Sequence, residues 1–224
     1  MSGAPGNVRS QSISCPSCGA PKEMRHPGIV MFTCEHCGSP VYWNEEAVRA
    51  GGRRAVLDEG FTRLYRGATG TYRRKRFRVL GRVRYLHGRD GVARGFWDEW
   101  FLRTSDGRDV WLTEDDHELS LQTRSEVDDA MAFDRYRVGS RVLHRDTEFV
   151  VEEIGVAECF GMEGELPDVW EVGETYPFVD LASPDGRYTL GFEFDEGENE
   201  PPTAFLGRWL EQSDLRLDDE GVDW

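Results

Sequence analysis

Four cysteines in two short, nearly identical motifs constrain this chain more than any other feature. The motifs read CPSCGAP at 15–21 and CEHCGSP at 34–40, with fifteen residues between Cys18 and Cys34. Tetrahedral Zn²⁺ binds four thiolates, and this spacing is typical of zinc ribbons. We therefore expect Zn²⁺ to be bound by Cys15, Cys18, Cys34 and Cys37.

The expected metal site is structural. Four thiolates fill the coordination sphere and leave no open position for water, as a catalytic site would need. The glycine after each second cysteine lets the backbone turn tightly, so that amide groups can point at the thiolates. Metal binding can supply on the order of 10 kcal/mol of folding free energy to such a small unit. Chelation is therefore expected to unfold residues 14–43.

Beyond the cysteines, short alternating runs separated by Gly, Asp and Pro predict a mainly β fold. We expect the zinc ribbon to be followed by two tandem, related antiparallel β modules. Asn44 and the two glutamates after it favour a short helix that ends near Gly51. The expected segments are a flexible tail at 1–13, a zinc ribbon with this helix at 14–50, a first β module at 61–124, a connector at 125–136, a second β module at 137–217 and an acidic tail at 218–224.

A basic run, TYRRKRFRVLGRVRYL at 71–86, stands out in a chain whose net charge is -15. From residue 76 its apolar and basic residues alternate, which predicts a half-buried strand. One face is expected to carry Phe77, Val79, Val83 and Tyr85, and the other Arg76, Arg78, Arg82 and Arg84. Gly81 interrupts the pattern and suggests a bulge. The run begins a predicted meander of four strands.

Charge is segregated along the chain. Residues 1–94 hold 17 basic against 7 acidic residues, a net of +10, and residues 95–224 hold 10 against 35, a net of -25. The two parts should attract each other. Asp98 and Glu99 could supply acids opposite the arginines of the predicted strand.

Two stretches of the chain resemble each other at an offset of 72 residues. RGATGTYRRKRFRV at 66–79 aligns with VGSRVLHRDTEFVV at 138–151, and TSDGRDVWLTE aligns with SPDGRYTLGFE further along. We interpret this as a degenerate internal repeat. The second copy has mixed charge where the first has Arg73, Arg74, Lys75 and Arg76. These four residues are therefore candidate phosphate-binding residues.

Other features favour a binding protein over an enzyme. No nucleophile elbow, phosphate loop, dinucleotide motif or HExxH motif is present. The aromatic run FWDEWFL is expected to be core, and Cys159 a small buried hydrophobe. Acidic clusters at 114–118, 195–200 and 217–223 could form a solvated edge or accept cations. No membrane-spanning or signal segment is found, so we expect a cytoplasmic location. In a reducing cytosol the clustered cysteines indicate a metal site rather than disulfides.

The motifs FRVLGRVRY, WDEWFL with VWLTED, GELP, FVDLASPDGRYTLGFEF and FLGRWL occur in that order. In this order they resemble an uncharacterised bacterial domain family, the domain of unknown function designated four-one-seven-eight, whose members often begin with a zinc ribbon. The resemblance spans residues 58–217. It implies no established activity, and it transfers no catalytic residue.

Three functions remain open at this point. The first is a non-enzymatic zinc-binding adaptor that mediates protein–protein interaction in a bacterial cytosolic assembly, with peripheral membrane association as an option. The second is nucleic-acid binding through the ribbon and the basic strand. The third is recognition of a polyamine or another cation by the acidic half of the chain. The protein partner and the oligomeric state are not specified by the sequence.

Overall fold

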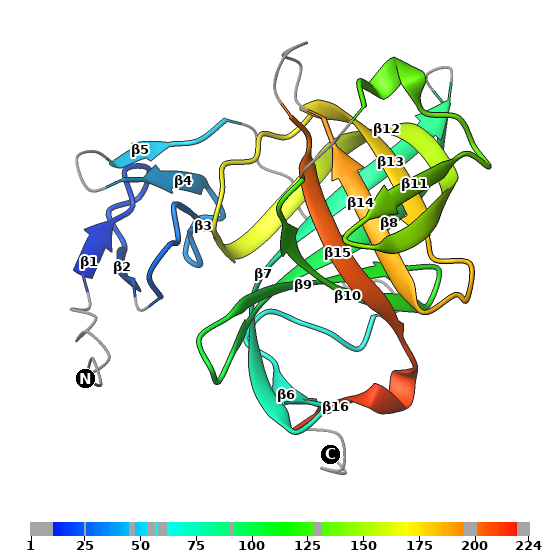
Figure 1. Ribbon diagram of the computed structural model, residues 1–224. Helices are drawn as coiled ribbons and strands as arrows, with labels where there is room; N and C mark the ends of the chain where they lie inside the picture. Colours follow the sequence, from blue (N-terminus) through cyan, green and yellow to red (C-terminus); the bar gives the residue numbers. More distant parts are fainter. Residues whose placement is uncertain are drawn as a thin grey trace, which may run out of the picture.

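The computed structural model describes residues 11–24, 26–44, 48–52, 57, 62–89, 92–127, 131–194 and 201–218, and within them it is mainly β (Figure 1). The strands are β1 (Gln11–Ser14), β2 (Pro21–Met24), β3 (Met31–Thr33), β4 (Pro40–Trp43), β5 (Val48–Ala50), β6 (Thr69–Tyr72), β7 (Lys75–Arg89), β8 (Val92–Thr104), β9 (Asp109–Asp115), β10 (Glu118–Ser125), β11 (Arg141–His144), β12 (Thr147–Leu166), β13 (Thr175–Ala182), β14 (Tyr188–Glu193), β15 (Thr203–Leu210) and β16 (Leu215–Leu217). Two short 3-10 helices, η1 (Phe133–Arg135) and η2 (Gln212–Asp214), complete the described elements. The mainly β prediction is confirmed.

The N-terminal unit contains five of these strands. β1 pairs with β2, while β3, β4 and β5 extend the large sheet because β3 pairs with β12. The helix predicted within 44–50 is wrong, since Val48–Ala50 pairs with β4 as strand β5. Pairing with a neighbouring strand outweighs the weak local preference for a helix. The tail predicted at 1–13 overlaps β1, in which Ile13 is buried, and its residues 1–10 lie outside the described residues.

Eight strands close into an antiparallel barrel. Their order around the barrel is β7, β8, β9, β10, β15, β14, β13 and β12, and β12 then pairs with β7. β7 to β10 form the meander predicted from the sequence, and β12 to β15 form the other half. The two predicted β modules therefore enclose one common interior rather than two separate ones.

At a bulge beside Gly81, the side chains of β7 that point into the barrel change from one set of alternate positions to the other. Phe77 and Val79 pack on the outside of the barrel, whereas Val83 and Tyr85 belong to the interior cluster. The register shifts between Val79 and Gly81, as expected for an extra residue in one strand. The predicted bulge is present, but the prediction that all four apolar residues share one face is wrong. A Cβ at Gly81 would lie 2.6 Å from the carbonyl oxygen of Glu165, so the close approach of β12 requires glycine.

Each half of the barrel has an apolar outer face covered by its own flanking segment. Outside β7 to β9, a cluster that includes Trp100 is covered by β16 and by residues 64–68. Outside β12 to β14, a cluster that includes Phe192 is covered by Tyr136. Tyr136 follows η1 in the connector predicted at 125–136, whose residues 128–130 are outside the described residues.

The two stretches aligned by the sequence form the same hairpin. The turn between β6 and β7 places Arg73 and Arg74 at φ 42° and 68°, and the turn between β11 and β12 places Arg145 and Asp146 at 47° and 62°. Two successive residues with positive φ are typical of the type I′ turn. The hydrogen bond from Gly67 N to the carbonyl oxygen of Val79 also recurs 72 positions later, between residues 139 and 151.

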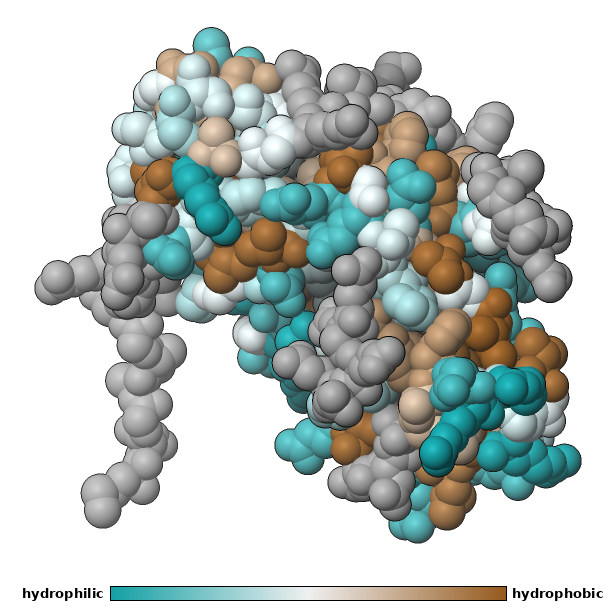
Figure 2. Space-filling view, turned by 90° about the horizontal axis from the view of Figure 1, so that it is seen from above, coloured by the Kyte–Doolittle hydropathy of each residue, from teal (hydrophilic) through white to brown (hydrophobic). Residues whose placement is uncertain are grey.

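The surface mixes polar and apolar side chains. On the face seen from above, hydrophilic and hydrophobic residues are interspersed (Figure 2). No helix among the described residues is long and apolar enough to cross a membrane.

Candidate functional site

The structure brings the four predicted metal ligands together. Cys15 Sγ lies 3.7 Å from Cys37 Sγ, Cys18 Sγ lies 3.7 Å from Cys34 Sγ, and all four sulfur atoms lie within 4.8 Å of one another. Four sulfurs at about 2.3 Å from a tetrahedral Zn²⁺ are separated by about 3.8 Å. The cluster therefore has the size of a tetrahedral metal site.

Two identical turns present the cysteines. Gly19 N donates to the carbonyl oxygen of Cys15, and Gly38 N donates to that of Cys34, with both glycines at positive φ. Hydrogen bonds from the side chain and backbone of Ser39 lower the pKa of Cys37 to about 6. Against a backbone hydrogen bond with Ala20, burial and hydrogen bonds with the other three cysteines raise the pKa of Cys18 to about 12. Of these two thiols, Cys37 is the one whose surroundings favour the thiolate that binds a metal.

The four candidate phosphate-binding residues do not form a patch of unpaired cations. Lys75 Nζ lies 2.8 Å from Asp106, and Arg76 Nη2 lies 2.6 Å from Asp218. Arg73 and Arg74 are exposed at the turn, where the Arg73 guanidinium lies over the ring of Tyr72. Half of the predicted basic charge is therefore engaged by acids from the C-terminal part of the chain.

Two arginines of β7 also form ion pairs with acids, but these pairs are buried. Arg84 forms two hydrogen bonds with Asp98, and Arg82 Nε lies 2.9 Å from Glu163. Arg82 and Arg84 are only 2% and 4% exposed. The expected pairing with acids is confirmed for both, although this part of the strand does not face solvent.

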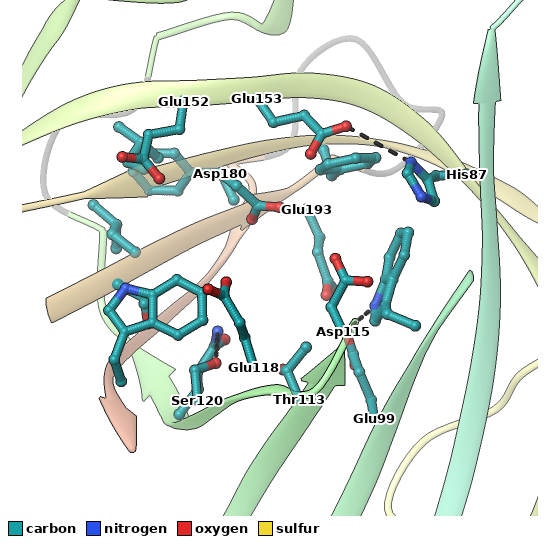
Figure 3. A pocket seen from close by; sticks show the side chains of 18 of the residues that line it. His87, Glu99, Thr113, Asp115, Glu118, Ser120, Glu152, Glu153, Asp180 and Glu193 are labelled. Carbon is teal, nitrogen blue, oxygen red and sulfur yellow. Dashed lines mark hydrogen bonds and ion pairs between the residues drawn. The ribbon is translucent and has the colours of Figure 1, made fainter. Parts of the chain in front are cut away.

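The interior of the barrel holds a cavity of about 260 Å³ (Figure 3). Every barrel strand contributes to its lining. The carboxylates that line it are Glu99, Asp115, Glu118, Glu152, Glu153, Asp180 and Glu193. Glu152, Glu153 and Asp180 approach the central space from one side in Figure 3, and Glu99, Asp115 and Glu118 from the other. Among the described residues, no lysine or arginine lines it, and His87 is the one group there that can become cationic.

Burial raises the pKa of three of these carboxylates. Burial raises the pKa of Glu99 to about 7, against the opposing hydrogen bond from Trp97 Nε1 at 3.0 Å. The pKa of Asp180 is also raised to about 7, first by burial and then by Glu153 and other acids. Asp180 is exposed to the cavity, but the barrel surrounds it, so its charge is poorly solvated. The pKa of Asp115 is raised for the same first reason.

Aromatic side chains line the same cavity. The contributors include Trp97, Tyr176, Phe178 and Trp209. Trp97 packs against Tyr85, with 5.3 Å between ring centroids, and Tyr176 meets the same ring edge-on at 5.3 Å. The lumen therefore combines negative charge with apolar and π surfaces.

The ribbon docks close to this aromatic group. Tyr42 Oη in β4 donates to the backbone oxygen of Trp170, whose Nε1 donates to Tyr85 Oη at 2.6 Å. A chain of contacts thus runs from the ribbon to the wall of the lumen. Burial raises the pKa of Tyr85 well above its usual value, so its hydroxyl stays protonated.

A second hollow, of about 610 Å³, lies outside β8 and β9. Its lining includes Asp98, which is already paired with Arg84, and Glu114, which accepts hydrogen bonds from Thr62 and Trp100. Asp98 and Glu114 are satisfied by the protein itself, and Asp115 lines this hollow as well as the lumen. The lumen is therefore the stronger candidate for a ligand.

Sequence reasoning did not identify the lumen. It recognised the acidic cluster at 114–118, but it interpreted the carboxylates as an edge or an acceptor surface. The sequence did contain an indication of it. Glu99 lies two positions from both Trp97 and Phe101, so it faces the same side of its strand as these two aromatic residues. Acids at inward positions of several strands indicate a polar interior, but only the closure of the barrel brings them to one cavity.

Comparison with protein families finds one match, to the domain of unknown function (DUF4178), over residues 66–212. The matched residues include the whole barrel and exclude the cysteine cluster. This confirms the resemblance inferred from the order of the motifs. No curated protein and no solved structure matches the chain.

Proposed function

Because this chain belongs to the DUF4178 family of unknown function, we propose a function from its geometry: a non-enzymatic binding protein whose barrel lumen takes up a small cation. One observation carries the proposal. Glu99, Asp115 and Asp180 reach one cavity from three different strands, and none of them forms an ion pair with a lysine or arginine in the described structure.

The electrostatics of the cavity support a cationic ligand. Carboxylates that share one cavity repel one another, which raises the free energy of their ionised forms. A bound cation reverses this by offsetting the lost hydration and the repulsion together. An anionic ligand would add to both costs, so we exclude nucleotides and phosphates from the lumen.

Aromatic walls add a second source of affinity. Cations bind over the faces of Trp and Tyr rings, and desolvation strengthens this attraction. Trp97 and Tyr176 line the same space as Glu99 and Asp180. A ligand that carries both positive charge and apolar surface would use every part of the wall.

We propose that the metal of the four-cysteine cluster is Zn²⁺ and that its role is structural. The sulfur separations suit tetrahedral coordination, and four cysteine ligands leave no position for a reacting water. Cysteines stay reduced and available to a metal in a reducing compartment, so we propose a cytoplasmic location.

An adaptor role remains our second proposal. Val138 and Leu143 are 67% and 72% exposed, an unusual position for large apolar side chains. Such residues suit a contact with another protein. Binding of nucleic acid through Arg73 and Arg74 also stays a prediction, and it requires steep salt dependence.

Isothermal titration calorimetry tests the main proposal. The full chain is titrated with spermidine, butylamine, Ca²⁺ and Mg²⁺ at about 0.15 M salt, where diffuse attraction is screened. We expect saturable 1:1 binding of at least one cation. Asp180→Asn should weaken it about tenfold or more, since it removes a carboxylate from the lumen.

Asp168→Asn is the matched control. Asp168 is exposed and pairs with Arg124 at 3.3 Å, outside the cavity. This variant should bind like the parent chain. If no cation binds the parent chain, or if both variants weaken binding equally, the proposed function is wrong.

A further inference from the structure

Among the described residues, no strand pairs with the outer edge of β11, whereas the equivalent edge of β6 pairs with β16. We propose that the outer edge of β11 is a docking site, at which an extended apolar segment of another protein adds as a third antiparallel strand. This proposal is independent of cation binding in the lumen, and it gives the adaptor role a defined surface.

The first hairpin shows what such an edge accepts. Thr71 in β6 and Leu143 in β11 are 72 positions apart, and each pairs with the residue five positions after it. On the first hairpin, Leu215–Leu217 adds as β16 in the register that places Arg216 opposite Thr71 (Figure 1). Both leucines of β16 are buried. An edge of this kind therefore binds a short extended segment with apolar residues.

Backbone groups of β11 are directed towards the missing strand. In an antiparallel hairpin, hydrogen-bonded pairs alternate with non-hydrogen-bonded pairs. His144 and Thr147 flank the two-residue turn and form a hydrogen-bonded pair, so the N–H and C=O of Leu143 point away from β12. The same alternation holds in β6, where the outward carbonyl oxygen of Thr69 accepts a hydrogen bond from Asp218 N at 2.9 Å. Leu143 thus presents a donor and an acceptor to an added strand.

The side chains at this edge are more apolar than the hairpin requires. Leu143 and Val138 are 72% and 67% exposed, whereas Thr71 and Arg66 hold the equivalent positions of the first copy. The shared hairpin geometry therefore does not depend on apolar residues at these two positions. An apolar residue opposite Leu143 on an added strand would cover the leucine side chain, and such cross-strand pairs stabilise a sheet.

The partner chemistry follows from these groups. An extended segment supplies backbone hydrogen bonds to the edge, and its side chains supply the specificity. A second copy of this chain suits the edge less well. The register that pairs Leu143 with itself places Arg141 opposite Arg145, and like charges directly opposite each other are destabilising. The edge is therefore assigned to an apolar segment of a different protein.

Amide hydrogen exchange of the full chain, followed by NMR, tests whether the edge is open. The amide of Leu143 should exchange at least about tenfold faster than that of Thr71, which β16 covers. Equally slow exchange of both amides in a monomer would show that the chain covers the edge itself. The same result in a dimer would place a second copy there. Either outcome would overturn the proposal.

Fluorescence anisotropy with a labelled peptide tests strand addition. The probe has the sequence of residues 213–218 with Arg216→Leu, which places an apolar residue opposite Leu143. We expect saturable binding to the full chain and slower exchange of the Leu143 amide in the complex. A peptide N-methylated at position 216 lacks the N–H that Leu143 would accept, so it should bind about tenfold more weakly. No binding at about 1 mM peptide would contradict strand addition.

Two variants separate the surface from the fold. Because the first hairpin carries Thr71, Leu143→Thr should keep the midpoint of thermal unfolding and weaken peptide binding about three- to tenfold. Leu143→Pro removes an N–H that points away from β12, so it should abolish binding while the hairpin hydrogen bonds remain. Val48→Thr changes an exposed apolar residue of β5 and should bind like the parent chain. Unchanged affinity in both folded Leu143 variants would refute the docking site.

Discussion

Arg84 and Asp98 form a buried pair in which Nε donates to Oδ1 and Nη2 donates to Oδ2, each at 2.8 Å. The two residues lie directly opposite each other on β7 and β8, and both are less than 5% exposed. Arg82 Nη1 also lies 3.5 Å from Asp98. Asp98 therefore contacts both guanidinium groups, and Glu163 supplies Arg82 with a second carboxylate.

Replacing this carboxylate should destabilise the barrel strongly. Asp98→Asn leaves Arg84 with a neutral neighbour in a buried site, while Arg82 keeps Glu163, and breaking a buried pair costs about 3–5 kcal/mol. Urea unfolding followed by tryptophan fluorescence measures the change. Asp106→Asn is the control, because its pair with Lys75 is exposed. Equal losses for the two variants would show that burial does not determine the effect.

Two glycines with the same backbone angle should respond differently to alanine. Gly164 and Gly139 both have φ +83°, but a Cβ at Gly164 would lie 2.2 Å from the carbonyl oxygen of Leu80, whereas nothing lies within 4 Å at Gly139. Gly139→Ala should cost about 1 kcal/mol from backbone strain alone. Gly164→Ala should cost several times more, because β7 and β12 must separate there. Thermal unfolding of both variants checks this, and similar midpoints would refute the close approach.

The protein without ligand should become less stable as pH rises from about 5 to 8. Burial raises the pKa of Glu99 from 4.5 to about 7 and that of Asp180 from 3.8 to about 7. Between these values the folded state binds more protons than the unfolded state, so the free energy of unfolding falls as pH rises and levels off above the folded pKa. Denaturant titrations across this range measure the slope.

Glu99→Gln supplies the test of that assignment. The variant should show a shallower decrease between pH 5 and 7, because one of the two titrating groups is gone. At pH 7, binding of an amine should also release protons from the parent chain, which calorimetry in buffers of different ionisation enthalpy detects. An unchanged slope in the variant would exclude Glu99 as the titrating group.

Removal of the metal should unfold the ribbon and spare the barrel. The ribbon joins the rest of the fold through the pairing of β3 with β12 and through contacts such as that of Tyr42 with Trp170, while the barrel is closed by its own strands. Chelation or Cys34→Ser should therefore abolish hydrogen-exchange protection in residues 31–43 and leave it in β7 and β12. Elemental analysis should find one zinc per parent chain. The same zinc content in a variant lacking all four cysteines would contradict the site.

Local sequence features fixed the elements that depend on short-range chemistry. The spacing of the cysteines predicts the four ligands, and alternation predicts β7 to β10 and the bulge at Gly81. The match between 66–79 and 138–151 predicts two hairpins that share their turn geometry. The ligands depend on covalent spacing, the strands on their two-residue period, and the hairpins on the residues that a turn accepts.

Only the tertiary structure determined which side chains of these strands point into the barrel. The bulge places Val83 inside the barrel and Val79 outside it, although the two have the same parity in the sequence. The pairing of β7 with β12 joins residues about 80 positions apart and encloses the acids that become the lumen. Alternation specifies that successive side chains point to opposite faces, but which face becomes an interior depends on barrel closure.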